Sequence, residues 1–149
     1  MPAILKLTMP LAQRPAGHAI STEISITNVS SRSLWVNARM ALNAEGDPVS
    51  FRDIWVSVLG PDKREIPFSC FVRIGPPEPS DYRILKPGES IRRTEVISDC
   101  YATDKPGTYR MVAFYKDGNP SPPSAPAGAV HLSRELQSDE ASVEVAPNR

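Results

Sequence analysis

Two cysteines are among the residues of this chain whose side chains could do chemistry. Cys70 and Cys100 could form a disulfide, or one of them could act as a nucleophile. A nucleophilic cysteine needs an adjacent base and an orienting group, and no cysteine-proteinase signature surrounds either residue. We read no secretory signal at the start of the chain and therefore expect a cytoplasmic protein with free thiols. A disulfide, in an extracellular or periplasmic protein, is the alternative if a leader has been removed.

The two histidines, His18 and His131, have no neighbours in the sequence that would make them metal ligands. Neither has a His, Cys or acidic partner at a metal-ligand spacing, so we expect two surface residues, no metal site and no cofactor. A glycine-rich phosphate loop, a GxSxG elbow and an HExxH motif are also missing from the sequence. Residues 117–119 (DGN) resemble part of a calcium loop but favour a turn. The sequence therefore predicts a protein that is not an enzyme.

Two tryptophans are the best candidates for a binding surface. Strict alternation places Trp35 and Trp55 on the face opposite the aliphatic residues of their strands, beside Arg39. Exposed aromatic rings with an arginine make good anchors for a protein partner, and they could also stack on sugar rings. The alternative is a β-bulge that turns one or both indoles into the core, which we favour for at least one of them.

Two proline-rich segments are further candidate contacts, in a chain with 16 prolines among 149 residues. Residues 75–80 (GPPEPS) can be neither helix nor central strand. Residues 117–129 (DGNPSPPSAPAGA) should be an extended or mobile loop between the last two strands. This loop is either a tolerated insertion or a docking segment. The prolines proposed as contacts are Pro76, Pro77, Pro120, Pro122 and Pro123.

The elements that must position these residues are short strands. Apolar residues recur at every second position, as at Ile20, Ile24 and Ile26, and this period of two is typical of half-buried strands. It predicts strands over 20–26, 34–42, 54–59, 68–74, 82–85, 90–98, 107–116 and 138–145. Helical patterns fit poorly, and the best window, 131–140, allows one short turn. An all-β antiparallel sandwich of seven to nine strands is expected.

Length and charge restrict the possible partners. The chain suits a single domain over residues 1–149, and its 17 basic and 17 acidic side chains cancel. A balanced charge gives no general attraction to nucleic acid or to an anionic membrane. No apolar run approaches the ~20 residues of a membrane-spanning helix. We therefore expect neither nucleic-acid binding nor membrane insertion, while the oligomeric state stays open.

Residues 85–115 (LKPGESIRRTEVISDCYATDKPGTYRMVAFY) carry the most specific pattern. Gly88 and Gly107 follow prolines in two predicted turns, each leading into a strand. Tyr109 comes just after the second turn, where a tyrosine corner would return its hydroxyl to nearby backbone. Met111 would fill a core position two residues later.

This PGES…PGTY spacing resembles the bacterial intracellular proteinase inhibitor family, and also the immunoglobulin-like region attached to some deuterolysin-type peptidases. Residues 24–36 (ISITNVSSRSLWV) are similar to a hairpin of both groups, and residues 136–145 (LQSDEASVEV) to their closing strand. The resemblance implies an immunoglobulin-like sandwich with Greek-key connections. It also implies a non-catalytic protein-binding module, either a proteinase inhibitor or a regulatory accessory protein. The alternative is a carbohydrate-binding or surface accessory module that uses Trp35 and Trp55.

Overall fold

Strands and turns make up almost all of the structure. The computed structural model describes residues 2–9, 13–15, 17–45 and 51–147. The helical elements in these ranges are two short 3₁₀ turns, η1 (Pro79–Asp81) and η2 (Ile97–Asp99), and neither is long enough to cross a membrane. The strands are β1 (Ala3–Thr8), β2 (Gln13–Pro15), β3 (Ser21–Asn28), β4 (Ser33–Asn37), β5 (Ile54–Leu59), β6 (Glu65–Ile66), β7 (Tyr82–Leu85), β8 (Ser90–Val96), β9 (Gly107–Tyr115), β10 (Ala129–His131), β11 (Leu136–Gln137) and β12 (Ala141–Ala146). The all-β prediction is confirmed.

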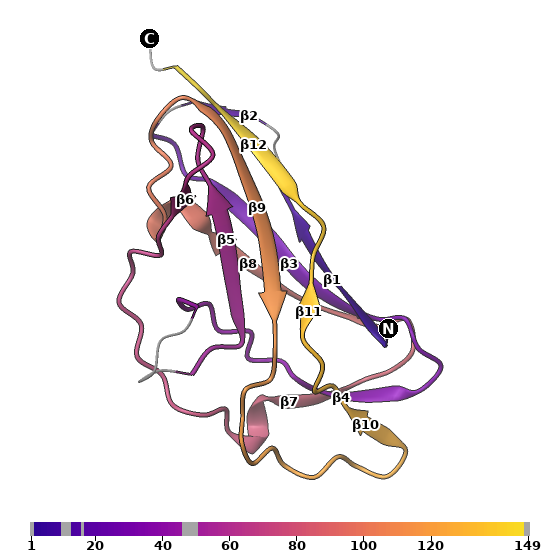
Figure 1. The fold of residues 1–149 in the computed structure, drawn as a ribbon. Helices are drawn as coiled ribbons and strands as arrows, with labels where there is room; N and C mark the ends of the chain where they lie inside the picture. Colours follow the sequence, from indigo (N-terminus) through magenta and orange to yellow (C-terminus); the bar gives the residue numbers. More distant parts are fainter. Residues whose placement is uncertain (1, 10–12, 16, 46–50, 148–149) are drawn as a thin grey trace.

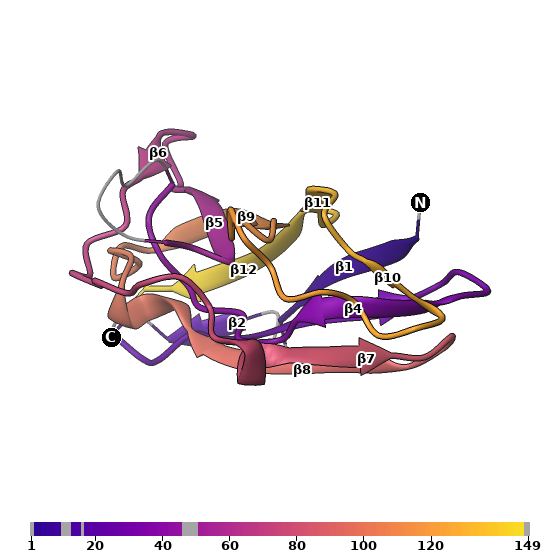
Figure 2. The ribbon, with the colours of Figure 1, turned by 90° about the horizontal axis from the view of Figure 1, so that it is seen from below.

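The strands form one large sheet and two small ones. The large sheet has the order β2-β12-β9-β5-β6, with β11 added beside β9, and the small sheets have the orders β1-β3-β8 and β10-β4-β7. Figure 1 shows β5 and β9 crossing in front of β3 and β8, and Figure 2 shows β5, β9 and β12 of the large sheet above a layer that contains β4, β7 and β8. Two pairings, β4 with β10 and β2 with β12, are parallel, unlike the antiparallel arrangement expected. Each joins strands far apart in the sequence, so no hairpin forces them to run in opposite directions.

The hydrophobic core lies between these layers. In β9 the alternate residues Tyr109, Met111, Ala113 and Tyr115 are buried, as the period of two predicts. They share a core cluster with alternate residues of β1, such as Leu5, and with buried residues of β3 and β5. Contacts between β1 and β9 join the two layers directly. Burial of these apolar side chains is the main driving force for this packing.

The second half of the PGES…PGTY pattern forms the structure predicted for it. The Tyr109 hydroxyl donates to the Lys105 carbonyl at 2.7 Å, which is a tyrosine corner. Met111 is fully buried in the core. Gly107 has a φ of +134°, and a Cβ at this position would lie 2.5 Å from the Cβ of Pro61. Another residue at position 107 would therefore strain the backbone and displace the 60–63 turn.

One buried asparagine, Asn28, joins the β3–β4 turn to the β7–β8 turn, which holds the PGES half of the pattern. The amide Nδ2 of Asn28 donates to the Leu85 carbonyl at 2.8 Å and to the Arg32 carbonyl at 2.7 Å. The main-chain carbonyl of Asn28 accepts the N–H of Gly88 at 2.8 Å, and Gly88 has a φ of +83°. The β3–β4 and β7–β8 turns are therefore held together by this residue. A glycan on Asn28, the acceptor position of an N-V-S sequon, would replace one hydrogen of Nδ2 and so remove at least one of these two hydrogen bonds.

Several predicted elements are shorter than expected or absent. The strand predicted over 34–42 ends at Asn37, and Met40 has a φ of +50°, which a continuing strand does not allow. Residues 68–74 alternate between exposed and partly buried side chains but are not paired as a strand. The 131–140 window holds the end of β10 and the whole of β11 instead of a helical turn. The period of two predicted which face each residue occupies more reliably than it predicted which segments pair.

Three strands at the edges of the sheets were not predicted by the pattern. β1 covers Ala3–Thr8, where Ala3, Leu5 and Leu7 point into the core and β3 pairs along its whole length. The short strands β2 and β6 lie at the two edges of the large sheet. Two- and three-residue strands give too little alternation to be recognised in a sequence.

Candidate functional site

Trp35 lies on the outer face of its small sheet, but another segment covers part of it. Its neighbours across the sheet are Ile84 on β7 and His131 on β10. Its indole N–H donates to the carbonyl of Pro123 at 3.1 Å, and its ring stacks on Tyr82 at a centroid distance of 5.7 Å. Trp35 is outside the core cluster, so the predicted alternation holds here. The indole nevertheless already binds the proline-rich loop of the same chain through this hydrogen bond.

Trp55 also faces away from the core cluster, yet only 5% of it is exposed. Its ring stacks on Phe114 with an interplanar angle of 7°, and the guanidinium of Arg52 lies 4.4 Å from the ring centroid. The β5–β9 register is continuous through Trp55, with no bulge, and neither indole belongs to the core cluster, so the bulge that we favoured for at least one tryptophan is wrong. The indole is therefore buried by its neighbours on the outer face, and it does not offer a stacking platform for a sugar.

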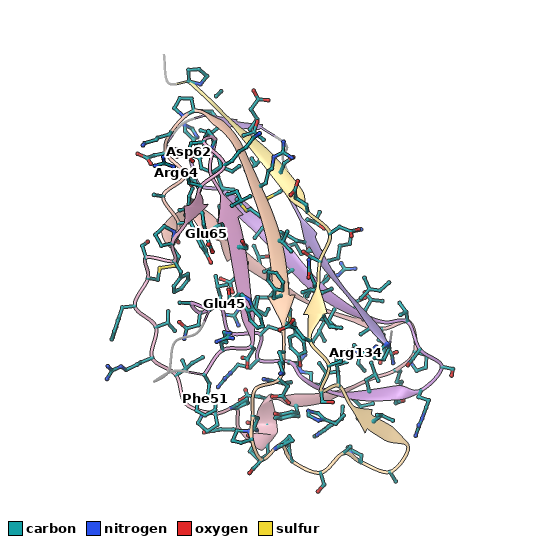
Figure 3. The ribbon with its side chains drawn as sticks, viewed as in Figure 1. Glu45, Phe51, Asp62, Arg64, Glu65 and Arg134 are labelled. Atoms are coloured by element: carbon teal, nitrogen blue, oxygen red, sulfur yellow. A yellow bond between two sulfur atoms is a disulfide. The ribbon has the colours of Figure 1, made fainter. Side chains whose placement is uncertain are left out.

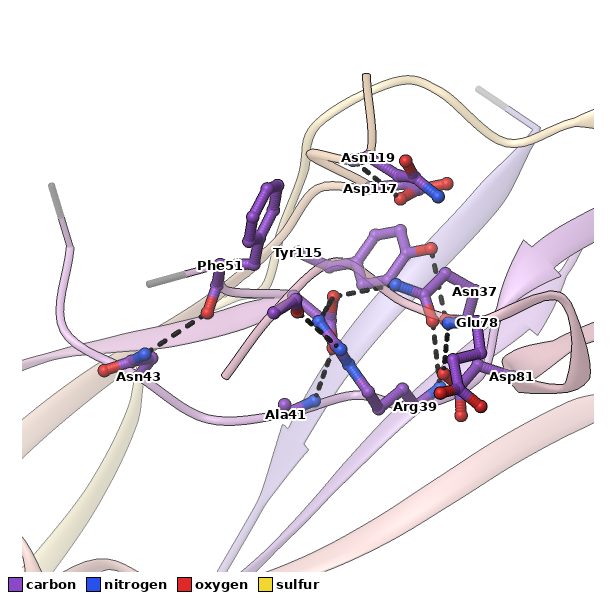
Figure 4. Close-up of polar contacts among 12 residues, drawn as sticks. Asn37, Arg39, Ala41, Asn43, Phe51, Glu78, Asp81, Tyr115, Asp117 and Asn119 are labelled. Atoms are coloured by element: carbon purple, nitrogen blue, oxygen red, sulfur yellow. Dashed lines mark hydrogen bonds and ion pairs between the residues drawn. The ribbon is translucent and has the colours of Figure 1, made fainter. Parts of the chain in front are cut away.

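Arg39 is held in an internal ion pair. Its Nε lies 2.8 Å from Oδ2 of Asp53, a residue that is 1% exposed, and its Nη1 donates to the Gly75 carbonyl at 2.9 Å. The same carboxylate accepts the Asn37 amide at 2.7 Å and the Ala41 N–H at 2.9 Å. Figure 4 shows Asn37, Arg39 and Ala41, the three residues that donate to this carboxylate, close together. Arg39 therefore links three parts of the chain, rather than serving as the binding anchor predicted beside the tryptophans.

A second buried carboxylate, Asp117, organises the region next to Trp35. Its Oδ2 accepts the Tyr82 hydroxyl and lies within hydrogen-bonding distance of His131 Nε2, each at 2.7 Å. Its Oδ1 accepts the N–H of Asn119 at 3.1 Å, which is the turn predicted for DGN. Burial, and next the hydrogen bond to Asp117, raise the pKa of Tyr82. Within the described residues, no hydroxyl or thiol forms a hydrogen bond to His131.

The 117–129 loop is held against the fold. Besides the bond from Trp35 to Pro123, Asn119 donates to the Tyr82 hydroxyl at 3.1 Å. Within the loop, the N–H of Ala129 donates to the Pro126 carbonyl at 3.0 Å and closes a turn. The loop was expected between the last two strands, but β10 and β11 separate it from β12. Among the prolines proposed as contacts, Pro76 and Pro120 are exposed, Pro122 and Pro123 are half-buried, and Pro77 is buried.

The cysteines form a disulfide, so the prediction of free thiols is wrong. Cys70 and Cys100 are bonded, with their Cα atoms 4.9 Å apart. The disulfide attaches the chain that follows β6 to the residue that follows η2. The N–H of Ser69 strengthens this attachment by donating to the Cys100 carbonyl at 2.7 Å. A separation of 30 residues gave no indication in the sequence that the two thiols meet.

The disulfide supports the Phe71 segment, a name we use for residues 67–75. Its even-numbered residues from Phe68 to Ile74 are partly buried, whereas Ser69, Phe71 and Arg73 are exposed. Phe71 is 84% exposed and is the most exposed large apolar side chain in the described part of the molecule. The guanidinium of Arg73 lies 5.4 Å from its ring centroid. A large aromatic ring held away from the core is a candidate contact for a partner.

A shallow groove runs between the start of this segment and β5. Glu45, Glu65, Phe68 and Tyr101 are among the residues that line it, and Figure 3 shows the two glutamates on this side of the molecule. The edge of Phe68 packs on the ring of Tyr101. Burial raises the pKa of Tyr101 to about 12, and its hydroxyl donates to the Val56 carbonyl at 2.8 Å. Among the described residues, no three His, Cys, Asp or Glu side chains are placed to hold a metal ion.

Sequence reasoning missed the Phe71 segment as a candidate site, although one signal was present. The alternation that placed Cys70 and Val72 on the inner face also placed Phe71 on the outer face. Because a strand was expected here, the main chain of this segment was expected to be paired within a sheet and therefore not available to a partner. The disulfide and the missing ladder are features of the tertiary structure, and together they leave the segment exposed.

The chain was compared with protein-family models and with curated proteins. No protein-family model matches the chain. No curated protein matches it either.

Proposed function

We propose that this chain is a non-catalytic protein-binding module whose contact surface is the Phe71 segment. One observation carries the proposal, namely that an aromatic ring with 84% exposure projects from a segment fixed by a disulfide. Buried aromatic and arginine side chains provide most of the energy at protein interfaces, and Arg73 lies beside this ring. A ring that has no place in the core gains apolar contact when a partner covers it.

The way the segment is held favours a protein as the ligand. Within the described residues, the main-chain groups of Phe71 and Arg73 form no hydrogen bonds. An extended chain with free N–H and C=O groups can pair with the main chain of another protein. The disulfide at Cys70 restricts the segment before binding, which reduces the entropy lost when a complex forms.

The carbohydrate alternative has less support. Trp55 is almost completely covered, and Trp35 already bonds to the proline-rich loop and stacks on Tyr82. A sugar could use these rings as a platform only after contacts within the protein were broken. We therefore place the binding surface at Phe71 and not at the tryptophans.

The resemblance of the PGES…PGTY pattern suggests the form that such binding would take. We propose a proteinase inhibitor or a regulatory partner, built on an immunoglobulin-like sandwich with Greek-key connections. The tyrosine corner at Tyr109 and the buried Met111 support that fold. The disulfide supports a location outside the cytoplasm, because disulfides persist in oxidising compartments.

Site-specific cross-linking tests the proposed surface. A photoreactive phenylalanine is placed at position 71 and, as a matched control, at Ile84, which is 45% exposed and neighbours Trp35. The proposal expects discrete protein adducts from position 71 in cells that make the protein, and none of the same mass from position 84. The same adducts from both positions, or adducts from position 84 alone, would contradict it.

A further inference from the structure

The side chains around Phe71 alternate as those of an extended chain do. No residue in the 67–75 range has a positive φ, and the exposed side chains alternate with partly buried ones. Phe71 and Arg73 are also free of main-chain hydrogen bonds to the described residues. Proteinases bind a substrate as an extended strand and pair with free N–H and C=O groups along its backbone. Phe71 and Arg73 therefore offer the unpaired main-chain groups that such pairing requires.

The side chain at the centre of the segment indicates which class of proteinase fits. The Phe71 ring is 84% exposed, and Arg73 contacts it from two residues further along. Chymotrypsin-like serine proteinases choose the side chain just before the cleaved bond with one specificity pocket, and a hydrophobic slot there accepts an aromatic ring. Phe71 is the aromatic residue at the exposed centre of this segment.

Both sides of the Phe71–Val72 peptide bond are attached to the fold. On one side, Cys70 is bonded to Cys100, and Ser69 donates to the Cys100 carbonyl. On the other side, the Val72 carbonyl accepts the amide of Asn43 at 3.2 Å. The Ile74 carbonyl accepts the N–H of Phe51 at 3.1 Å, so the attachment continues beyond Val72.

Asn43 is placed to act as an internal support for this bond. The residue is buried, and its amide also donates to the Phe51 carbonyl at 3.2 Å, the bond drawn in Figure 4. It therefore links the carbonyl of Val72 to the neighbouring chain at Phe51. A segment held on both sides loses little entropy on binding, and its two halves stay adjacent even if a proteinase attacks the bond between them.

We infer that the Phe71 segment binds, as a substrate-like inhibitor, in the active-site cleft of a serine proteinase that prefers aromatic residues, with Phe71 in its specificity pocket. No covalent bond has to change for this binding. The inference rests on the proposed function and deepens it, because it names the class of partner for the same surface.

Inhibition assays with chymotrypsin and trypsin test the inference on the intact protein. The wild type should inhibit chymotrypsin and leave trypsin unaffected. Phe71→Ala should weaken inhibition of chymotrypsin by roughly 30-fold or more, as for a side chain at the centre of an interface. Ile4→Ala, at an exposed position on β1, should leave inhibition unchanged. Phe71→Arg should transfer inhibition to trypsin, whose pocket accepts a basic side chain.

Three results would overturn the inference. They are no inhibition of chymotrypsin by the wild type, inhibition that survives Phe71→Ala, and rapid cleavage after Phe71 as in an ordinary substrate. The proposed function is tested separately, because discrete cross-links at position 71 without inhibition of chymotrypsin would leave a protein-binding surface with a different class of partner. If neither cross-links at position 71 nor inhibition of chymotrypsin were observed, the Phe71 segment would not be a binding surface.

Discussion

Two regions of this molecule present aromatic and arginine residues, and they differ in whether those residues already have partners. In one, the closed region, Trp35, Arg39, Asp53, Tyr82 and Asp117 bond to each other and to the loops around them. In the other, the Phe71 segment, the ring and the guanidinium of Arg73 project into solvent from a tethered chain. The residue types are similar, but only the second group is available to a partner.

This difference shows why residue type alone is a weak guide to a binding site. An exposed position on a sheet face predicts a contact only if no other part of the chain covers it. Here the proline-rich loop returns along β4 and covers Trp35, whereas nothing among the described residues covers Phe71. The loop that looked most like a docking segment serves mainly to close the neighbouring surface.

The largest expected effect comes from breaking the closed region. Asp53→Ala removes the carboxylate that pairs with Arg39 and accepts the Asn37 amide, so a largely enclosed guanidinium loses its counter-charge. We expect the free energy of unfolding to fall by about 3–5 kcal/mol. Urea denaturation measures the change. Asp62→Ala, which removes an exposed carboxylate beside Arg64, should cost less than about 1 kcal/mol, and equal losses for the two variants would contradict a closed region.

A smaller effect is expected beneath the Phe71 segment, and it depends on pH. The pKa of Tyr101 is raised by burial from 10.0 to about 12, so the folded protein keeps this proton at pH values where the unfolded chain loses it. This contribution to stability is complete below pH 10 and is lost as the pH rises from about 10 to about 12. Tyr101→Phe should therefore flatten the fall in the free energy of unfolding over that window.

At neutral pH, Tyr101→Phe should lower the free energy of unfolding by about 1 kcal/mol, because the hydroxyl that donates to the Val56 carbonyl is lost. Urea titrations of both proteins at several pH values measure both effects, and the titration of other groups is common to the two proteins. Parallel curves above pH 10 would show that burial does not control the tyrosine proton.

The smallest effect on stability is expected at Phe71 itself. Because the ring is 84% exposed and has no core contacts, Phe71→Ala should change the free energy of unfolding by less than about 0.5 kcal/mol. Thermal and urea denaturation measure it, with Phe68→Ala as the comparison, since that ring packs against Tyr101. A loss at Phe71 as large as the loss at Phe68 would mean that the two rings are equally part of the fold.

The sequence predicted the local structure of this protein better than its long-range contacts. Alternation gave the correct inner face of β9, and the PGTY turn gave the tyrosine corner at Tyr109. The Cys70–Cys100 bond joins positions 30 residues apart, and Asp117 meets both Tyr82 and His131 from distant parts of the chain. No short sequence window contains these pairs, so periodicity could not indicate them.

The candidate site was missed for a related reason. Residues 68–74 alternate as a strand does, but a strand also needs a partner along its edge, and the choice of partner depends on the whole sheet. In the structure β6 ends at Ile66, and the chain beyond it is held by the disulfide and by Asn43 rather than by a ladder. The sequence therefore predicted which way Phe71 faces, but not that its main chain is free.

The most direct test of the account compares the two regions in one assay. Inhibition constants for chymotrypsin are measured for the wild type, for Phe71→Ala and for Trp35→Phe, together with their free energies of unfolding. We expect Phe71→Ala to lose inhibition without losing stability, and Trp35→Phe to keep its inhibition. If Trp35→Phe lost inhibition while Phe71→Ala retained it, the binding surface would lie at the tryptophan face and the account would be wrong.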